Sequence, residues 1–273
     1  MSVSRIAERF AALKAEDRAA FIPYIVAGDP DAKTAARILA GLPAAGADLI
    51  ELGLPFSDPM ADGPAIQRGA ARALAEGMTT AKVLELVAGF RAADRVTPII
   101  LMGYFNPILS LGLDAFAKAA GEAGVDGLIM VDVPPEEGGL LAAALEHHDI
   151  ALIRLATPTT DEARLATVAS GTQGFVYFVA VTGVTGAKEA NADAIAADVA
   201  RVRAASALPV AVGFGIRTAA RAAEVARIAD AAVVGSALVE TIAQEIAIKR
   251  DPAPKVLDTA AAMAQAVRSA RVN

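Results

Sequence analysis

The chain has 273 residues, a net charge of −6 and a pI near 5.1, and 55% of its residues are hydrophobic. This composition supports a large buried core, excludes global disorder, and argues against nucleic acid or an anionic membrane surface as a partner. The absence of cysteine excludes disulfides, thiolate–metal sites and a thiol nucleophile, and the only histidines are His147 and His148.

The mean hydropathy of +0.47 reflects abundant alanine rather than a membrane segment. Charges interrupt every apolar run before the roughly 18 residues that a membrane-spanning helix needs. The first twenty residues follow an amphipathic helical pattern with charges throughout, unlike a signal peptide. We therefore expect a soluble, cytoplasmic protein.

Short apolar runs rich in β-branched residues alternate with alanine-rich segments of helical spacing. The predicted strands are Phe21–Val26, Leu49–Leu52, Pro98–Met102, Gly127–Val131, Ala151–Leu155, Phe175–Ala180, Pro209–Val212 and Ala231–Val234. The predicted helices are the N-terminal segment, Thr34–Leu42, Ala81–Ala92, Leu113–Ala123, Glu136–Glu146, Asp161–Ser170, Ile195–Ala204, Thr218–Ile228 and, after Pro252 and Pro254, Val256–Arg271.

Eight strand–helix repeats predict parallel β–α units closed into a (β/α)8 TIM barrel, with residues 1–273 forming one domain. An open doubly wound sheet is the alternative. Such a sheet normally carries a glycine fingerprint after its first strand, where this chain has the turn Ala27-Gly28-Asp29-Pro30.

Two connections are longer than a β–α unit needs. The second strand is followed by residues 53–63 and by an extra helix that begins at Pro64 and ends near Gly77. The sixth strand is followed by the Thr/Gly-rich stretch Val181–Ala187, which is either a lid or an ordinary flexible loop. Long βα loops lie at the C-terminal face of a barrel, where barrel enzymes have their active sites.

Two carboxylates are candidates for general acid–base chemistry. Glu51 stands near the end of an apolar strand, where burial should raise its pKa toward neutrality. Asp62 lies in the long loop that follows. The alternatives are that Glu51 pairs with a barrel arginine, that Asp62 only caps the helix beginning at Pro64, and that Asp58 takes the role given to Asp62.

Glycines mark the ends of the last two predicted strands. Gly213-Phe214-Gly215 and Gly235-Ser236 occupy the loops that usually bind phosphate in barrel enzymes, and Gly186 can add a further backbone donor. The alternative is that each glycine serves only a tight turn. The chain has no GxxxxGK[ST] motif, so a nucleoside triphosphate is not indicated.

Other residues narrow the chemistry. Tyr104 and Tyr177 fall near the ends of the third and sixth strands and belong either to a pocket or to the core. Arg154 lies inside the fifth strand and needs either a partner or a place at the barrel mouth. No lysine falls on a predicted strand, which argues against a Schiff-base aldolase. Clustered metal ligands are missing from the sequence. The remaining chemistry is metal-free, cofactor-free acid–base catalysis on a phosphorylated substrate.

Several motifs together resemble the tryptophan synthase α subunit family. They are Tyr24–Pro30 (YIVAGDP), Glu51–Gln67 (ELGLPFSDPMADGPAIQ), Asp132–Pro134 (DVP), Gly183–Ala187 (GVTGA), Gly213–Ile216 (GFGI) and Gly235–Val239 (GSALV). They occur in family order and span nearly the whole chain. The resemblance implies retro-aldol cleavage of indole-3-glycerol phosphate to indole and glyceraldehyde 3-phosphate.

The resemblance also implies roles for single residues. Glu51 would protonate indole C3 and take the glycerol hydroxyl proton, and Asp62 would hold the indole N–H. Tyr104, Tyr177 and Thr185 would contact substrate. Gly186, Gly213, Phe214, Gly215, Gly235 and Ser236 would cradle its phosphate. The chain departs from the family pattern at Val181, where many members carry arginine, and at Tyr24, where others have phenylalanine.

The family further implies a partner. The α subunit docks on a β subunit in an αββα complex, with Pro55–Met60 near the contact, and pyridoxal phosphate is bound by the β subunit only. Two other functions remain open from the residues alone. One is a sugar-phosphate isomerase or epimerase, and the other is a non-catalytic subunit that binds a phosphorylated ligand and regulates a partner.

Overall fold

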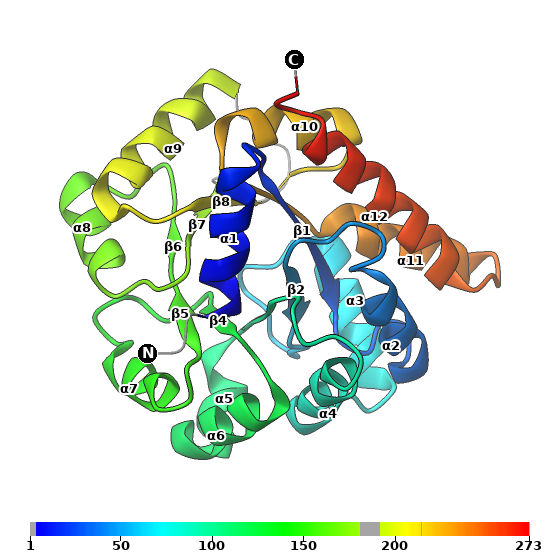
Figure 1. Ribbon diagram of the computed structural model, residues 1–273. Coiled ribbons are helices and arrows are strands. Elements are labelled where there is room, and N and C mark those ends of the chain that lie inside the picture. Colours follow the sequence, from blue (N-terminus) through cyan, green and yellow to red (C-terminus); the bar gives the residue numbers. More distant parts are fainter. Residues whose placement is uncertain (1–3, 181–191, 214, 273) are drawn as a thin grey trace.

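The computed structural model describes residues 4–180, 192–213 and 215–272, and its strands form one parallel sheet that closes into a barrel (Figure 1). The strand order is β5-β4-β3-β2-β1-β9-β8-β7-β6. Their bounds are β1 Ala20–Val26, β2 Ile50–Gly53, β3 Ile99–Gly103, β4 Gly127–Met130, β5 Ala151–Ile153, β6 Leu155–Ala156, β7 Val176–Val179, β8 Val210–Gly213 and β9 Ala231–Val234.

Only Arg154 separates β5 from β6, so the two together occupy the position of one strand in the barrel. β5 pairs with β4 and β6 pairs with β7, which closes the sheet. The predicted (β/α)8 barrel and its eight strands are therefore confirmed, and the fifth predicted strand is interrupted at one residue.

Helices surround the sheet, and α1 lies across one end of the barrel (Figure 1). Their bounds are α1 Arg5–Ala15, α2 Ala32–Gly41, α3 Pro64–Ala75, α4 Thr80–Arg91, α5 Phe105–Leu111, α6 Leu113–Ala123, α7 Gly139–Glu146, α8 Glu162–Ser170, α9 Ala192–Ser206, α10 Ala219–Ile228, α11 Ser236–Ala247 and α12 Pro252–Arg268. Across the described ranges, no helix has the length and apolar character needed to cross a membrane.

The structure corrects the predicted helices in two ways. Sequence analysis did not predict α5 and α11, which follow β3 and β9 directly. The last helix begins at Pro252 instead of Val256, because proline needs no N–H partner in a first helical turn. Asp251 precedes it as the N-cap and accepts a hydrogen bond from the Ala253 N–H at 3.1 Å.

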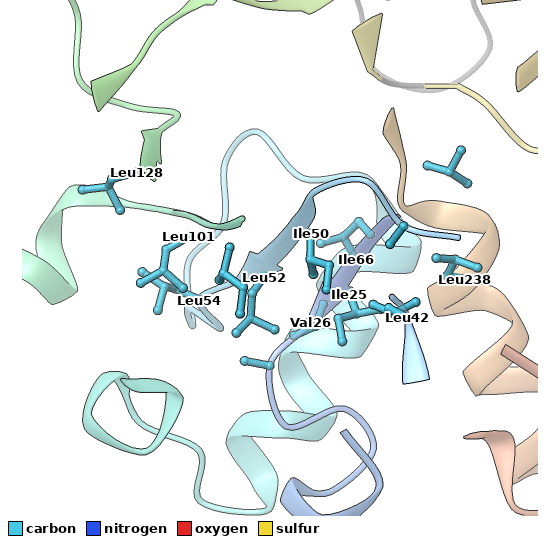
Figure 2. Packing of buried hydrophobic residues seen from close by; sticks show 14 of the residues in the cluster. Ile25, Val26, Leu42, Ile50, Leu52, Leu54, Ile66, Leu101, Leu128 and Leu238 are labelled. Carbon is cyan, nitrogen blue, oxygen red and sulfur yellow. The ribbon is translucent and has the colours of Figure 1, made fainter. Parts of the chain in front are cut away.

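Side chains alternate between two apolar layers along each strand. The outer layer lies between strands and helices and includes Ile50 and Leu52 of β2 (Figure 2). The inner layer fills the barrel and includes Leu49, Ile100 and the α1 residue Phe10. Because Glu51 is two residues beyond Leu49, its side chain faces the barrel interior.

Three aspartates join the starts of neighbouring strands. Asp48, Asp126 and Asp230 each precede a strand and accept a hydrogen bond at 2.8 Å from a backbone N–H near the start of the adjacent strand. Asp126 also pairs with Arg91 of α4 and, at 2.6 Å, with Arg5 of α1. These ion pairs attach α1 to the N-terminal end of the barrel.

Asp126→Ala is expected to lower the free energy of unfolding by about 3 kcal/mol, because it leaves the buried Arg91 guanidinium without its carboxylate. Urea unfolding measures the change. Glu122→Ala, which removes an exposed carboxylate on α6, is the control and should change stability by less than about 0.5 kcal/mol. Equal, small effects of the two substitutions would contradict a structural role for Asp126.

Candidate active site

Glu51 is a buried carboxyl group inside the barrel. It lies on β2 in register with Tyr24 of β1 and Ile100 of β3, and its exposed fraction is 0%. Neither of its oxygens has a hydrogen-bond partner among the described residues, so the structure gives no support to the arginine-pairing alternative. Desolvation raises the pKa of Glu51 to about 8. Glu51 is therefore protonated at neutral pH and can act as an acid.

Two tyrosines surround Glu51. Burial raises the pKa of both Tyr24 and Tyr177, and the Glu51 charge adds to the shift in each, which places both phenols close to the carboxyl group. Glycines on neighbouring strands make room for the rings. A Cβ atom on Gly53 would lie 2.1 Å from the Tyr24 Oη, and one on Gly213 would lie 2.0 Å from the Tyr177 Oη. Larger residues at these glycines would displace the tyrosines.

Asp62 lies in the loop that precedes α3. The N-cap of α3 is Gly63, so Asp62 does not have the capping role that sequence analysis left open. Burial raises the pKa of Asp62, and a hydrogen bond from Tyr104 opposes that shift. Asp58, the competing carboxylate, is exposed and is hydrogen-bonded to Ser57. Asp62 is thus the carboxylate of this loop that faces the barrel mouth.

Tyr104 holds the loop in place. Its hydroxyl accepts a hydrogen bond from the Ala61 N–H at 2.9 Å, and its ring packs against Phe56 with 5.2 Å between centroids. Burial raises the pKa of Tyr104, and the charge of Asp62 raises it further. Tyr104 remains a hydrogen-bond donor for the Asp62 carboxylate throughout the neutral range.

A pocket of about 80 Å³ opens at the C-terminal ends of the strands. Its walls come from β1, β3, β7 and β9 and from the starts of α3 and α11. The lining residues are Tyr24, Asp62, Gly63, Ile66, Met102, Tyr177, Gly215, Ile216, Val233, Gly235 and Ser236. Glu51 does not line it. The register of β1 and β2 places Glu51 directly beside the wall residue Tyr24.

One wall of the pocket suits an anion. Ser236 is the first residue of the twelve-residue helix α11 and Gly235 is its N-cap, so the N-terminal turn and the positive end of the helix dipole lie at the pocket. Gly215 adds a turn with φ +86°, a conformation that L side chains rarely adopt. A phosphate group at this wall could accept hydrogen bonds from the N–H groups of the first turn of α11.

The predicted site residues divide into three groups. Asp62, Tyr177, Gly215, Gly235 and Ser236 meet in the pocket, with Tyr104 bonded to Asp62 and Glu51 beside the wall. Gly213 does not line the pocket and instead makes space for Tyr177. Thr185, Gly186 and Phe214 lie outside the described residues, as does Val181.

Sequence analysis missed part of the pocket wall. Met102, Ile66 and Val233 were treated as ordinary strand or helix residues, although their positions at strand ends and at the start of α3 carried a signal. Within residues 4–180, 192–213 and 215–272, no three histidine or carboxylate side chains converge as metal ligands. Arg154 lies outside this pocket, with its guanidinium donating a 3.3 Å hydrogen bond to the Thr167 carbonyl.

Comparison with known proteins identifies the family. A family model described as tryptophan synthase alpha chain matches residues 10–268. Tryptophan synthase alpha chains from Caulobacter sp. strain K31 and Phenylobacterium zucineum are 63% and 61% identical to this chain, covering 100% and 99% of it and 99% and 98% of the relatives.

Solved structures agree with the sequence relatives. The α subunit of tryptophan synthase from Legionella pneumophila superposes with a TM-score of 0.91 at 40% identity, over 97% of this chain and 99% of that one. A chain from tryptophan synthase of M. tuberculosis in an aminoacrylate-bound form gives 0.87 at 35% identity, over 97% and 100%. With its barrel and the pocket geometry, the chain belongs to the tryptophan synthase alpha chain family.

Proposed function

We propose that Glu51 and Asp62 carry the reaction of this family, cleavage of indole-3-glycerol phosphate to indole and glyceraldehyde 3-phosphate in tryptophan biosynthesis. The observation that supports this best is Glu51, a fully buried carboxyl group without a hydrogen-bond partner among the described residues, with a pKa of about 8. A proton on such a group is available at neutral pH, and the dry surroundings favour its transfer to carbon.

The reaction needs an acid first and a base second. Glu51 gives its proton to indole C3, which converts the ring to an indolenine and puts positive charge on the ring nitrogen. The Glu51 carboxylate then takes the proton of the glycerol hydroxyl next to C3. The C–C bond breaks, its electron pair returns to the ring, and the hydroxyl-bearing carbon becomes the aldehyde. Glu51 is protonated again at the end of the cycle.

Asp62 supports the charged intermediate. Its carboxylate accepts a hydrogen bond from the indole N–H. The negative charge of the carboxylate stabilises the positive charge on the ring while C3 carries the extra proton. Burial raises the pKa of Asp62, and the hydrogen bond from Tyr104 opposes that shift and so favours the carboxylate. The two carboxyl groups thus divide the work, since the pKa of Glu51 favours the neutral acid and the Tyr104 bond favours the Asp62 anion.

The phosphate anchors the other end of the substrate. Gly215, Gly235 and Ser236 offer backbone N–H groups in the same pocket as Asp62, so an anchored phosphate would restrain the glycerol chain beneath the indole ring. Tyr177 would pack against the substrate beside Glu51. Thr185, Gly186 and Phe214 stay predictions from the family resemblance.

We propose that residues 1–273 act as one barrel domain that binds no cofactor of its own and docks on a tryptophan synthase β subunit. The loop at residues 55–60 is the proposed contact, and its Met60 side chain is 83% exposed. Pyridoxal phosphate would be held by that partner.

The direct test is incubation of the purified chain with indole-3-glycerol phosphate, with and without a β subunit. Slow release of glyceraldehyde 3-phosphate that the β subunit accelerates is expected. No release in either condition would contradict the proposal and favour an isomerase or a regulatory subunit.

A further inference from the structure

An ion pair joins the turn after β1 to the last turn of α3, between a buried carboxylate and a partly exposed guanidinium. The Asp29 carboxylate, with a side chain 0% exposed, meets the Arg72 guanidinium side-on, with Nε–Oδ1 at 2.7 Å and Nη2–Oδ2 at 2.8 Å. Burial raises the pKa of Asp29, and the Arg72 charge and hydrogen bonds oppose that shift. Neither residue lines the pocket, and neither has a part in the chemistry described above.

The helix is shaped to accept this pair. A Cβ atom on Gly69, one turn before Arg72, would lie 2.9 Å from the Asp29 Oδ2, so the absence of a side chain lets α3 approach the turn closely. Ile66 lies one further turn back and lines the pocket. Residues three apart share one face of a helix, so a single face of α3 runs from the pocket to the ion pair.

The two elements that the Asp29–Arg72 ion pair joins, α3 and β1, each lie next to one of the proposed catalytic residues. α3 begins at Pro64, two residues after Asp62. β1 carries Tyr24, which is in register with Glu51 on β2. A shift of α3 along β1 would therefore move Asp62 relative to Glu51.

We propose that Asp29 and Arg72 are positioning residues that hold α3 against β1 and so set the place of Asp62 relative to Glu51. A two-bond guanidinium–carboxylate pair defines both a distance and an angle, whereas apolar faces alone permit sliding. The inference rests on the proposed role of Asp62 in catalysis.

Arg72→Lys is the informative substitution, since lysine keeps the charge but cannot form the two parallel bonds. We expect kcat for indole-3-glycerol phosphate cleavage to fall about tenfold, with KM changed less than about twofold, because a displaced Asp62 fails mainly in the transition state. Arg91→Lys is the matched control. It weakens a buried pair with Asp126 at the opposite end of the barrel and should lower stability in urea without lowering kcat.

A double-mutant cycle with Asp62→Asn separates positioning from general stability. In the Asp62→Asn background, the side chain at position 62 has no charge with which to stabilise the intermediate, so a displacement of that side chain costs less kcat. Arg72→Lys should therefore lower kcat by less than about threefold in this background. An equal fall in both backgrounds, or no fall in either, would overturn the inference.

The Asp62→Asn variant and the cycle distinguish failure of the proposed catalytic role of Asp62 from failure of the positioning inference. Asp62→Asn with wild-type kcat would overturn the proposed role of Asp62, and the positioning inference would fall with it. A large loss in Asp62→Asn combined with independent effects in the cycle would overturn the inference alone. If Arg72→Lys does not fold, Asp29→Asn enters the same cycle, with the same expected coupling.

Discussion

Glu51→Gln is expected to lower kcat for indole-3-glycerol phosphate cleavage by about 10³-fold, with the barrel intact. Glutamine has the size of glutamate, but it can neither give a proton to C3 nor take one from the hydroxyl. The substitution removes no hydrogen bond found among the described residues, because neither Glu51 oxygen has a partner there. A steady-state assay of glyceraldehyde 3-phosphate release, together with circular dichroism, measures both effects.

The same variant should gain stability at alkaline pH. Between the ordinary pKa of 4.5 and about 8, folded Glu51 holds a proton that the unfolded chain has lost. Because this pKa is raised on folding, the contribution of Glu51 to stability is fully present below pH 4.5 and falls as the pH rises, by up to about 1.4 kcal/mol per pH unit. Glutamine has no such dependence.

Urea unfolding of wild type and Glu51→Gln at several pH values tests this linkage. The advantage of the variant should grow with pH and level off above about 8, where the folded wild type also loses the proton. A pH-independent difference would mean that Glu51 is already ionised in the folded protein. Near-normal turnover by Glu51→Gln would separately contradict its catalytic role.

Asp62→Asn is expected to lower kcat by about 10²-fold, since the amide can still accept the indole N–H but carries no charge to stabilise the indolenine. Binding of glyceraldehyde 3-phosphate should survive, because the phosphate wall at Gly215, Gly235 and Ser236 is on other elements. Turnover assays and calorimetric titration measure the two quantities.

Asp58→Asn is the matched control, since Asp58 lies in the same loop but is exposed. It should leave kcat within about twofold of wild type, because its charge is screened by water. Loss of phosphate-ligand binding in Asp62→Asn with unchanged chemistry would contradict the role proposed for Asp62, and a large kcat loss in Asp58→Asn would give that role to Asp58.

Sequence analysis predicted the barrel because buried parallel strands read as short apolar runs, as at Ile99–Gly103 and Ala231–Val234. It predicted Glu51 because a carboxyl group inside such a run is costly to bury and is typical of a catalytic site. It missed α5, a short helix of seven residues with Pro107 in its first turn, where proline is tolerated.

Long-range packing accounts for the remaining differences. A Cβ atom on Gly213 would overlap the ring of Tyr177, which comes from a neighbouring strand, so packing is a second reason for glycine there. The predicted contact of Gly213 with phosphate stays a prediction. Asp29 looked like a turn residue, since its partner Arg72 is 43 positions away. Sequence spacing cannot report contacts of this kind, because α2, β2 and the loop before α3 lie between the two residues.

The pH dependence of kcat/KM for indole-3-glycerol phosphate cleavage by the purified chain tests whether Glu51 is the proton donor, since this parameter reports the free enzyme. We expect kcat/KM to decline above a pKa of about 8, as Glu51 loses the proton it must give to C3. Activity that stays level well above that pH, or no cleavage at any pH, would contradict this role of Glu51.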